Sequence, residues 1–365
     1  MAPARLIDVM PGARGTRMTP QQRDWLRTRL GDAHIGIAGV TGAVGREMLA
    51  LLEEVRIPKS GIIATGSSRS LGTRIPYADD EIIVESAESL RATECVLLAT
   101  PSSVSRALMP MLIECGMKIS DTSSAFRSQV PLIIPEINAA SINLTDRIVA
   151  SPNCTTTIAL TAVEGIRKRF GFCSLEIVSY QAVSGAGTEA MHALLDETRD
   201  IVNDGVTQAR WLDEQIAFNV FPHESAVDPA TGLCIEEQKF IDESSRILNS
   251  SEIETAATCM RVPSLRTHTV AIRIESVLAC DRVSITNALR STPGVNFVES
   301  GPSSLAATAT CSILAGPPVV QPTNARNGST IRLIVAGDQL LKGAAWNALQ
   351  NLALLRSTSR RQQIE

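Results

Sequence analysis

A short apolar segment, a glycine-rich loop and an amphipathic helix follow one another near the start of this 365-residue chain. Residues 35–38 read IGIA, residues 39–45 read GVTGAVG, and residues 44–55 place their apolar side chains at helical spacing before a second apolar run at 62–65. This alternation predicts two parallel strands joined by a helix. Further apolar runs predict additional strands of the same sheet, at 95–98 and 117–120. We therefore expect an α/β fold with a Rossmann-type dinucleotide-binding domain in the first half of the chain.

The pattern changes after residue 152, and the chain is long enough for two domains. The hydrophobic fraction of 44% is sufficient for packed cores. We expect the following organisation: an N-terminal extension over 1–30, a dinucleotide-binding domain over 31–152, a mixed α+β catalytic domain over 153–339, a helix over 343–356 that docks back on the first domain, and a mobile tail over 357–365. The extension is rich in arginine and poor in acids, which is compatible with organellar targeting, but we favour an extension that ends in a short helix near 21–30.

Composition argues against several classes of protein. The formal net charge of −4 gives no general basic field, so nucleic acid and anionic membranes are poor partners and small metabolites fit better. No run of eighteen apolar residues is present, so no transmembrane helix is expected. The eight cysteines form no CxxC pair and the chain has only four histidines, which favours reduced cytoplasmic thiols over a disulfide framework or a metal site.

The glycine loop and the end of the second predicted strand indicate a nucleotide cofactor. Glycines let the backbone approach a pyrophosphate, whose charge then meets the helix N-terminus. The expected contacts come from Gly39, Thr41, Gly42, Ala43, Val44 and Gly45. NAD-specific sites usually place an acid after the second strand, but here the chain reads Ser67-Ser68-Arg69, which suits a 2′-phosphate. We predict NADP, with a solvated turn and an incidental arginine as the alternative.

Cys154 follows Pro152 and Asn153 and directly precedes an apolar-periodic run, so we expect it at the start of a helix. Backbone N–H groups of a first helical turn lack internal partners, and they can stabilise a thiolate or an oxyanion formed next to it. The alternative is a buried structural cysteine, because free cysteines are commonly buried. This pattern alone leaves both interpretations open.

Ten segments in a fixed order resemble the aspartate-β-semialdehyde dehydrogenase family, from about residue 34 to 350. Single segments are common, but their order and separations together are specific. The matching segments are GVTGAVG (39–45), SSRSLG (67–72), DTSSAFR (121–127), PLIIPEIN (131–138), SPNCTTT (151–157), SYQAVSGAG (179–187), NVFPH (219–223), EEQK (236–239), CMRVPSLRTH (259–268) and KGAAWNALQ (342–350).

The resemblance implies roles for individual residues. It makes Cys154 the nucleophile, Gln181 its orienting neighbour and His268 the acid/base. It assigns the substrate's carboxylate to Arg261, its amino group to Glu236, and its phosphate to Arg127, Asn153 and Lys239. It also adds Ser184, Gly185 and Gln339 to the cofactor site. It also implies a homodimer or homotetramer, with the second domain forming the interface.

The implied reaction is the NADP-dependent reductive dephosphorylation of L-aspartyl-4-phosphate to L-aspartate 4-semialdehyde through a Cys154 thioacyl intermediate, in lysine, threonine and methionine biosynthesis. Cysteine suits this step because it is strongly nucleophilic and leaves well. An imidazole with an ordinary pKa near 6.5 suits proton transfer. A guanidinium binds a carboxylate through two parallel hydrogen bonds, which suits Arg261. Without the resemblance, Glu236 and Lys239 would be interpreted as a surface (i, i+3) pair.

The sequence also departs from the family pattern at several positions: Thr122, Arg266, Thr269, Gln339 and the loop 99–103. None of these changes removes a reacting group, but we expect Arg266 to add bulk and charge close to the active site. Two alternatives stay open at this point. One is a related acyl-phosphate reductase of the N-acetylglutamyl-phosphate type, and the other is a catalytically silent relative that binds NADP.

Overall fold

The computed structural model describes residues 17–323 and 327–362, with side chains described as far as residue 357. The chain forms two compact units. The first unit extends to Pro152 and takes in the chain from Gly343 onward, and the second unit runs from Asn153 to Lys342. Most of the predicted N-terminal extension, residues 1–16, lies outside the described residues.

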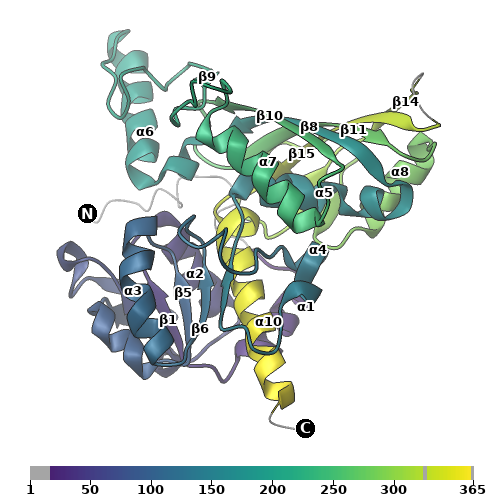
Figure 1. The fold of residues 1–365 in the computed structure, drawn as a ribbon. Helices are drawn as coiled ribbons and strands as arrows, with labels where there is room; N and C mark the ends of the chain where they lie inside the picture. The colour runs from purple at the N-terminus through teal and green to yellow at the C-terminus, as the bar shows by residue number, and fades with distance from the viewer. Residues whose placement is uncertain (1–16, 324–326, 363–365) are drawn as a thin grey trace. The chain divides into compact units, whose positions relative to one another are not determined.

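The first unit contains a five-stranded sheet in the order β2-β1-β5-β6-β7, and every neighbouring pair in it is parallel (Figure 1). β1 and β5 are buried along their whole length, as expected for a parallel sheet covered on both faces. The strands of this sheet are β1 (Ile35–Ala38), β2 (Ile62–Thr65), β5 (Cys95–Leu98), β6 (Lys118–Asp121) and β7 (Ile148–Ala150). The expected Rossmann-type arrangement is confirmed.

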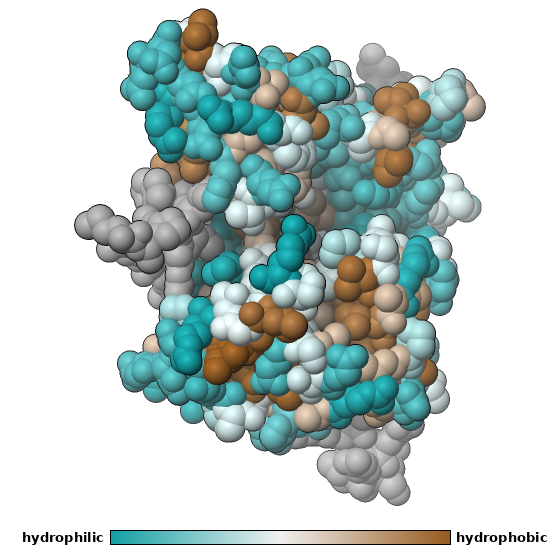
Figure 2. Space-filling model, turned by 90° about the vertical axis from the view of Figure 1, so that its left-hand side faces the viewer, coloured by the Kyte–Doolittle hydropathy of each residue, from teal (hydrophilic) through white to brown (hydrophobic). Residues whose placement is uncertain are grey.

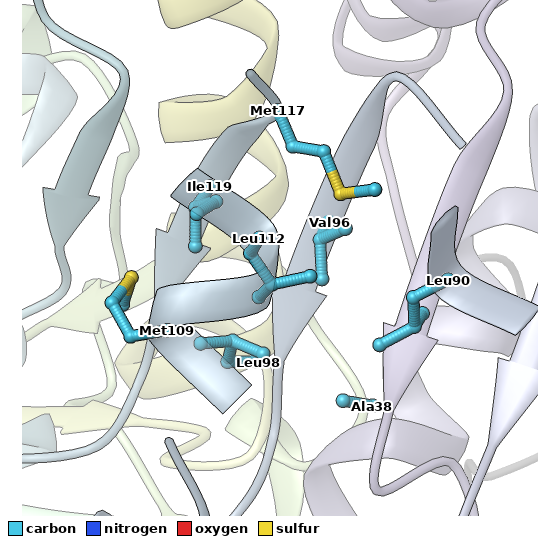
Figure 3. Packing of buried hydrophobic residues seen from close by; sticks show 8 residues of the cluster. All are labelled: Ala38, Leu90, Val96, Leu98, Met109, Leu112, Met117 and Ile119. Carbon is cyan, nitrogen blue, oxygen red and sulfur yellow. The ribbon is translucent and has the colours of Figure 1, made fainter. Parts of the chain in front are cut away.

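Helices and a hairpin complete the first unit. Its helices are α1 (Pro20–Leu30), α2 (Ala43–Glu54), α3 (Ser102–Glu114), α4 (Pro135–Asn138) and α10 (Trp346–Gln362), and β3 (Arg74–Tyr77) pairs with β4 (Asp80–Ile83). Figure 3 shows how α3 presents Met109 and Leu112 to Val96, Leu98 and Ile119 of the sheet. This apolar contact fixes the carboxyl ends of the strands, where the loops of the unit begin.

The last helix of the chain packs on the sheet of the first unit, contacting β5, β6 and β7. A π-helical turn at Leu341–Ala345 precedes it, and α10 extends as far as Gln362. Helix therefore continues into the segment expected as a mobile tail. Trp346 lies edge to face with Trp25 of α1, with ring centroids 6.4 Å apart, so the short helix expected near 21–30 is present and packed.

The second unit contains a mixed eight-stranded sheet, in the order β12-β13-β15-β11-β8-β10-β9 with β14 paired to β15. Its strands are β8 (Phe172–Gln181), β9 (Phe221–Pro222), β10 (Glu254–Arg261), β11 (His268–Ser276), β12 (Val295–Phe297), β13 (Ile313–Ala315), β14 (Val319–Pro322) and β15 (Ser329–Gly337). Its helices are α5 (Cys154–Phe170), α6 (Thr188–Asp204), α7 (Ile235–Leu248), α8 (Arg282–Ser291) and α9 (Ser304–Ala307). This is the mixed α+β unit that the sequence predicts.

The helices α5, α7 and α8 cover one face of this sheet (Figure 1). The side chains along each strand accordingly alternate between the covered face and the opposite face. On β8, Leu175 and Ile177 point to the helices and are buried, whereas Glu176 and Tyr180 are exposed on the opposite face. The second unit therefore has one covered face and one open face.

Hydrophilic side chains predominate on the surface of the molecule shown in Figure 2, with apolar side chains in small groups among them. None of the helices in the described part of the chain combines the length and hydropathy needed to cross a bilayer. The eight cysteines, all of them among the described residues, form no disulfide bond. Within 17–323 and 327–362, no cluster of three or more His, Cys, Asp or Glu side chains could hold a metal ion.

Candidate active site

Sheet topology brings three of the predicted site residues to one edge of the second unit. β10 lies parallel to β8 in a register that pairs Arg261 with Gln181, the last residues of the two strands. β11 runs antiparallel to β8 and pairs Thr269 with Tyr180, so His268 at the start of β11 lies level with Gln181. All three side chains are almost fully buried.

Cys154 is the first residue of α5, and Asn153 is its N-cap. The Asn153 side-chain oxygen accepts hydrogen bonds from the backbone N–H groups of Thr155, at 2.8 Å, and Thr156, at 3.4 Å. The Cys154 sulfur is 3.5 Å from Nε2 of His268. A candidate nucleophile and a candidate acid/base are therefore in contact at a helix N-terminus.

The same capping bonds change one expectation. The sequence predicts that N–H groups of the first turn of α5 are available for an oxyanion, but two of them, those of Thr155 and Thr156, donate to the Asn153 side chain. The N-cap therefore competes for the donors that this expectation assigned to the oxyanion.

The hydrogen bonds of His268 fix the position of its proton. The backbone N–H of Ala182 donates to Nδ1 at 3.1 Å, so Nδ1 is unprotonated and a neutral ring carries its proton on Nε2. Burial, reinforced by the positive charge of Arg261, lowers the pKa of His268 to about 3. At neutral pH the ring is therefore uncharged, and its Nε2–H is directed at the Cys154 sulfur.

Glu236 links several of the predicted residues. Its carboxylate accepts hydrogen bonds from Nδ2 of Asn153 at 2.7 Å and from Nε2 of Gln181 at 3.5 Å, and it lies 3.2 Å from Nζ of Lys239. Burial raises the pKa of Glu236, but the attraction of Lys239 and His223 and the hydrogen bond from Asn153 outweigh burial and bring the pKa to about 2. Glu236 is only 6% exposed, so it does not form an ordinary surface pair with Lys239.

Arg261 is held by carboxylate and carbonyl oxygens. Its Nε and one terminal nitrogen bind the two carboxylate oxygens of Glu224, and its other terminal nitrogen donates to the backbone oxygen of Ala182 at 2.7 Å.

The structure thus gathers seven predicted residues in the second unit: Asn153, Cys154, Gln181, Glu236, Lys239, Arg261 and His268. Arg127 belongs to the first unit, where one of its terminal nitrogens donates to the backbone oxygen of Thr122 at 3.0 Å.

The glycine loop of the first unit fits a dinucleotide phosphate. Gly39 and Gly45 have no room for a side chain. A Cβ added to Gly39 would lie 2.3 Å from the backbone oxygen of Ala99, and a Cβ added to Gly45 would lie 2.2 Å from the backbone oxygen of Gly39. At Gly42 the space is nearly open. The first-turn N–H groups of α2, at 43–45, have no acceptor among the described residues. A phosphate group supplies such acceptors.

The remaining predicted cofactor residues lie on both units. Ser67, Ser68 and Arg69 form an exposed turn after β2, and Arg69 is not paired with any acid in the described part of the chain. In the second unit, Nε2 of Gln339 is hydrogen-bonded to Oγ of Ser184. A Cβ added to Gly185 would lie 3.4 Å from the ring of His268.

Comparison with known proteins agrees with this geometry. Residues 34–145 match the family model described as semialdehyde dehydrogenase, NAD binding domain, and residues 163–342 match the model described as semialdehyde dehydrogenase, dimerisation domain. Aspartate-semialdehyde dehydrogenase of Bacillus subtilis is 33% identical over 87% of this chain and 95% of its own length. The enzyme of that name from Synechocystis is 33% identical over 88% of this chain and 96% of its own length.

The chain belongs to the aspartate-semialdehyde dehydrogenase family. Its fold is likewise similar to the crystal structure of aspartate semialdehyde dehydrogenase II from Vibrio cholerae complexed with ASA, with a TM-score of 0.82, 28% identity, and coverage of 88% of this chain and 98% of that one. Membership makes it an oxidoreductase with a nucleotide-binding domain and a dimerisation domain.

Arg266 and Thr267, the two residues before the histidine of this family member, are held by buried contacts. Arg266 does not add a free charge, because its Nε lies 2.6 Å from the Asp338 carboxylate and both side chains are buried. Thr267 adopts φ +75°, an uncommon conformation for a β-branched residue. Its N–H donates to Oε1 of Gln339 and its hydroxyl contacts that of Thr308, both at 2.8 Å. These bonds hold the strained backbone immediately before His268.

Sequence reasoning missed three residues that contact the site. Glu243 accepts the backbone N–H of Asn153 at 2.6 Å, and its spacing of seven residues from Glu236 on one helix was an available signal. His223 and Glu224 contact Arg261, but no local periodicity connects either of them to a residue so far along the chain.

Proposed function

We propose that this member of the family catalyses the NADP-dependent reductive dephosphorylation of L-aspartyl-4-phosphate to L-aspartate 4-semialdehyde, a step in lysine, threonine and methionine biosynthesis. The main support is the 3.5 Å contact between the Cys154 sulfur and Nε2 of His268 at the start of α5. Buried groups of opposite charge surround this contact, as recognition of an amino acid requires.

Cys154 is the proposed nucleophile. Its thiolate attacks the activated carbonyl carbon, so that a carbon–sulfur bond forms, the carbon–oxygen bond to phosphate breaks and phosphate leaves. The nicotinamide, when bound, supplies the hydride that reduces the resulting thioester. Loss of the aldehyde then breaks the carbon–sulfur bond and returns the electron pair to Cys154.

His268 is the proposed proton donor of the site. Because its proton lies on Nε2, 3.5 Å from the sulfur, the ring can stabilise the thiolate and donate to an oxyanion that forms on the adjacent carbon. The neighbouring N–H of Ala182 holds the ring in this tautomer. His268 therefore acts first as a donor, and it can accept a proton only after it has given one away.

The substrate's remaining groups have candidate partners. Glu236 stays ionised because its pKa is about 2, so it can pair with the substrate's ammonium group. Arg261 is proposed for the α-carboxylate, and Lys239, Asn153 and Arg127 for phosphate. In the first unit, the unpaired Arg69 with Ser67 and Ser68 supports the preference for NADP.

We also propose a homodimer formed through the open face of the second unit's sheet. Apolar side chains are exposed there, among them Tyr180 at 41% and Ile334 at 50%. A hollow of about 500 Å³ lies over β8, β11 and β15 on the same face. The domain that matches the dimerisation model contains all of these residues.

The experiment is a spectrophotometric assay in the reverse direction, with L-aspartate semialdehyde, phosphate and NADP. We expect phosphate-dependent formation of NADPH and slower reaction with NAD. N-acetylglutamate semialdehyde should be a poor substrate, because it has no free ammonium group for Glu236. Equal or better use of the N-acetylated aldehyde would assign the enzyme to the sister reaction, and absence of turnover with both aldehydes would refute the proposed function.

A further inference from the structure

Every nitrogen of the Arg261 guanidinium already has an acceptor. Nε donates to Glu224 at 3.0 Å, one terminal nitrogen donates to Glu224 and lies 3.0 Å from Nε2 of His223, and the other donates to the backbone oxygens of Ala182 and Gln181 at 2.7 and 3.4 Å. A guanidinium has five N–H donors, and Glu224 and the two backbone oxygens accept four of them. In this state Arg261 has no pair of adjacent donors left for the bidentate binding of a substrate carboxylate.

Glu224 holds the position that such a carboxylate would need. It meets Nε and one terminal nitrogen of Arg261 with its two oxygens, which is the bidentate geometry of arginine–carboxylate recognition. Burial raises the pKa of Glu224, but the hydrogen bonds and positive charge of Arg261 outweigh burial, so the pKa lies below its usual value. Glu224 is therefore an ionised, internal equivalent of a substrate carboxylate.

The surroundings allow Glu224 to move and keep Arg261 in place. The Arg261 side chain is 2% exposed and lies at the end of β10, whereas that of Glu224 is 19% exposed and lies between β9 and α7. His223, the residue before Glu224, binds Arg261, and Ser225, the residue after it, accepts the N–H of Glu236 at 3.2 Å. Rotation of the Glu224 side chain can thus release the guanidinium while the backbone stays anchored.

Leaving Arg261 without a partner is costly, because a buried charge needs a counter-charge. Exchanging one carboxylate for another avoids that cost, since the number of ion pairs on Arg261 is unchanged. We propose that Glu224 occupies the guanidinium of Arg261 in the ligand-free enzyme, and that the substrate's carboxylate binds by displacing it. Glu224 is then a specificity-determining residue, because only a group able to replace a bidentate carboxylate gains access to Arg261. This inference rests on the proposed role of Arg261 in binding the substrate's carboxylate.

The test measures affinity for an unreactive probe. L-2-Aminobutyrate carries the ammonium and carboxylate groups of the substrate but has no reactive carbonyl, and n-propylamine has no carboxylate. Isothermal titration of the full chain should show that Glu224→Gln binds L-2-aminobutyrate about tenfold more tightly than the unmodified protein, because a neutral amide competes less well for Arg261. The affinity for n-propylamine should not improve.

Two further variants keep the test decisive. Asp242→Asn changes an exposed acid on α7 that contacts Gln238, and it should leave both affinities unchanged. Glu224→Asp keeps the charge but shortens the side chain, so it should give an intermediate gain and should decide the matter if the glutamine variant does not fold. Circular dichroism shows which variants are folded.

The inference is overturned if the folded Glu224 variants bind L-2-aminobutyrate as weakly as, or more weakly than, the unmodified protein. Glu224 would then be a fixed support for Arg261. This result is distinguishable from failure of the proposed function, in which the aldehyde assay gives no turnover. The binding measurement requires no turnover, and tighter binding by the folded Glu224 variants supports the exchange in either case.

Discussion

The individual side chains of the site are organised around Glu236. Its carboxylate contacts the N-cap of α5, the end of β8 and Lys239 of its own helix, so one charge links three elements. Its proposed partner is the ammonium group of the substrate. The same buried charge also couples the stability of the enzyme to pH.

We predict that Glu236→Gln lowers the free energy of unfolding most at neutral pH. The pKa of Glu236 is lowered from 4.5 to about 2 in the folded protein, so the unfolded chain binds more protons between these values and stability rises with pH there. This contribution is fully present above about pH 4.5 and is lost as the pH falls toward 2. It amounts to about 3 kcal/mol.

Urea unfolding at pH 7 and at acidic pH measures this effect. The difference in the free energy of unfolding between the unmodified protein and Glu236→Gln should shrink as the pH falls. The exposed residue Glu214 provides a matched control, because Glu214→Gln should show no such change. A difference that is independent of pH would show that Glu236 contributes no stabilising charge.

At the scale of elements, substitutions at two glycines of the loop before α2 distinguish an effect on packing from an effect on ligand binding. Gly45→Ala places a methyl group 2.2 Å from the backbone oxygen of Gly39, so we expect it to destabilise the first unit by about 1–3 kcal/mol or more. Gly42→Ala meets only that oxygen at 3.4 Å and should fold. Its methyl group lies where a phosphate would approach the N–H groups of α2.

Thermal unfolding and nucleotide titration measure the two effects. Gly42→Ala should retain the melting temperature and bind NADP at least tenfold more weakly, whereas Gly45→Ala should melt at a lower temperature. Unchanged NADP affinity in Gly42→Ala would place the nucleotide elsewhere.

The elements also show where sequence reasoning succeeds and fails. The parallel sheet of the first unit was predictable because β1 and β5 are continuous buried apolar runs, and a glycine loop with the helix α2 follows β1. The order of the second sheet was not predictable, because β8 pairs with both β10 and β11, which are distant in sequence. The residues Gln181, Arg261 and His268 could be selected by family resemblance, but their common edge follows only from this pairing. The contact of Glu224 with Arg261 joins a loop residue to the last residue of a strand, so it has no periodic signal in the sequence.

For the whole molecule, the proposed dimer depends on the open face of the second sheet. We predict that light scattering gives a mass near twice 39.0 kDa, and that Ile334→Asp shifts the protein to the monomer by placing a charge in the interface. Val283→Asp is the matched control, because Val283 is 69% exposed on α8, which packs on the other face. A dimer that persists in Ile334→Asp would place the interface elsewhere.

The central claim is that Cys154 carries the acyl group, and a single-turnover experiment tests it most directly. The enzyme is mixed with L-aspartate semialdehyde and NADP in the absence of phosphate, and both NADPH and the mass of the Cys154 peptide are measured. We predict a burst of about one NADPH per subunit, an acylated Cys154, and resumed turnover when phosphate is added, with none of these in Cys154→Ala. An unmodified Cys154 in enzyme that turns over normally with phosphate, or a burst that survives in Cys154→Ala, would contradict the account.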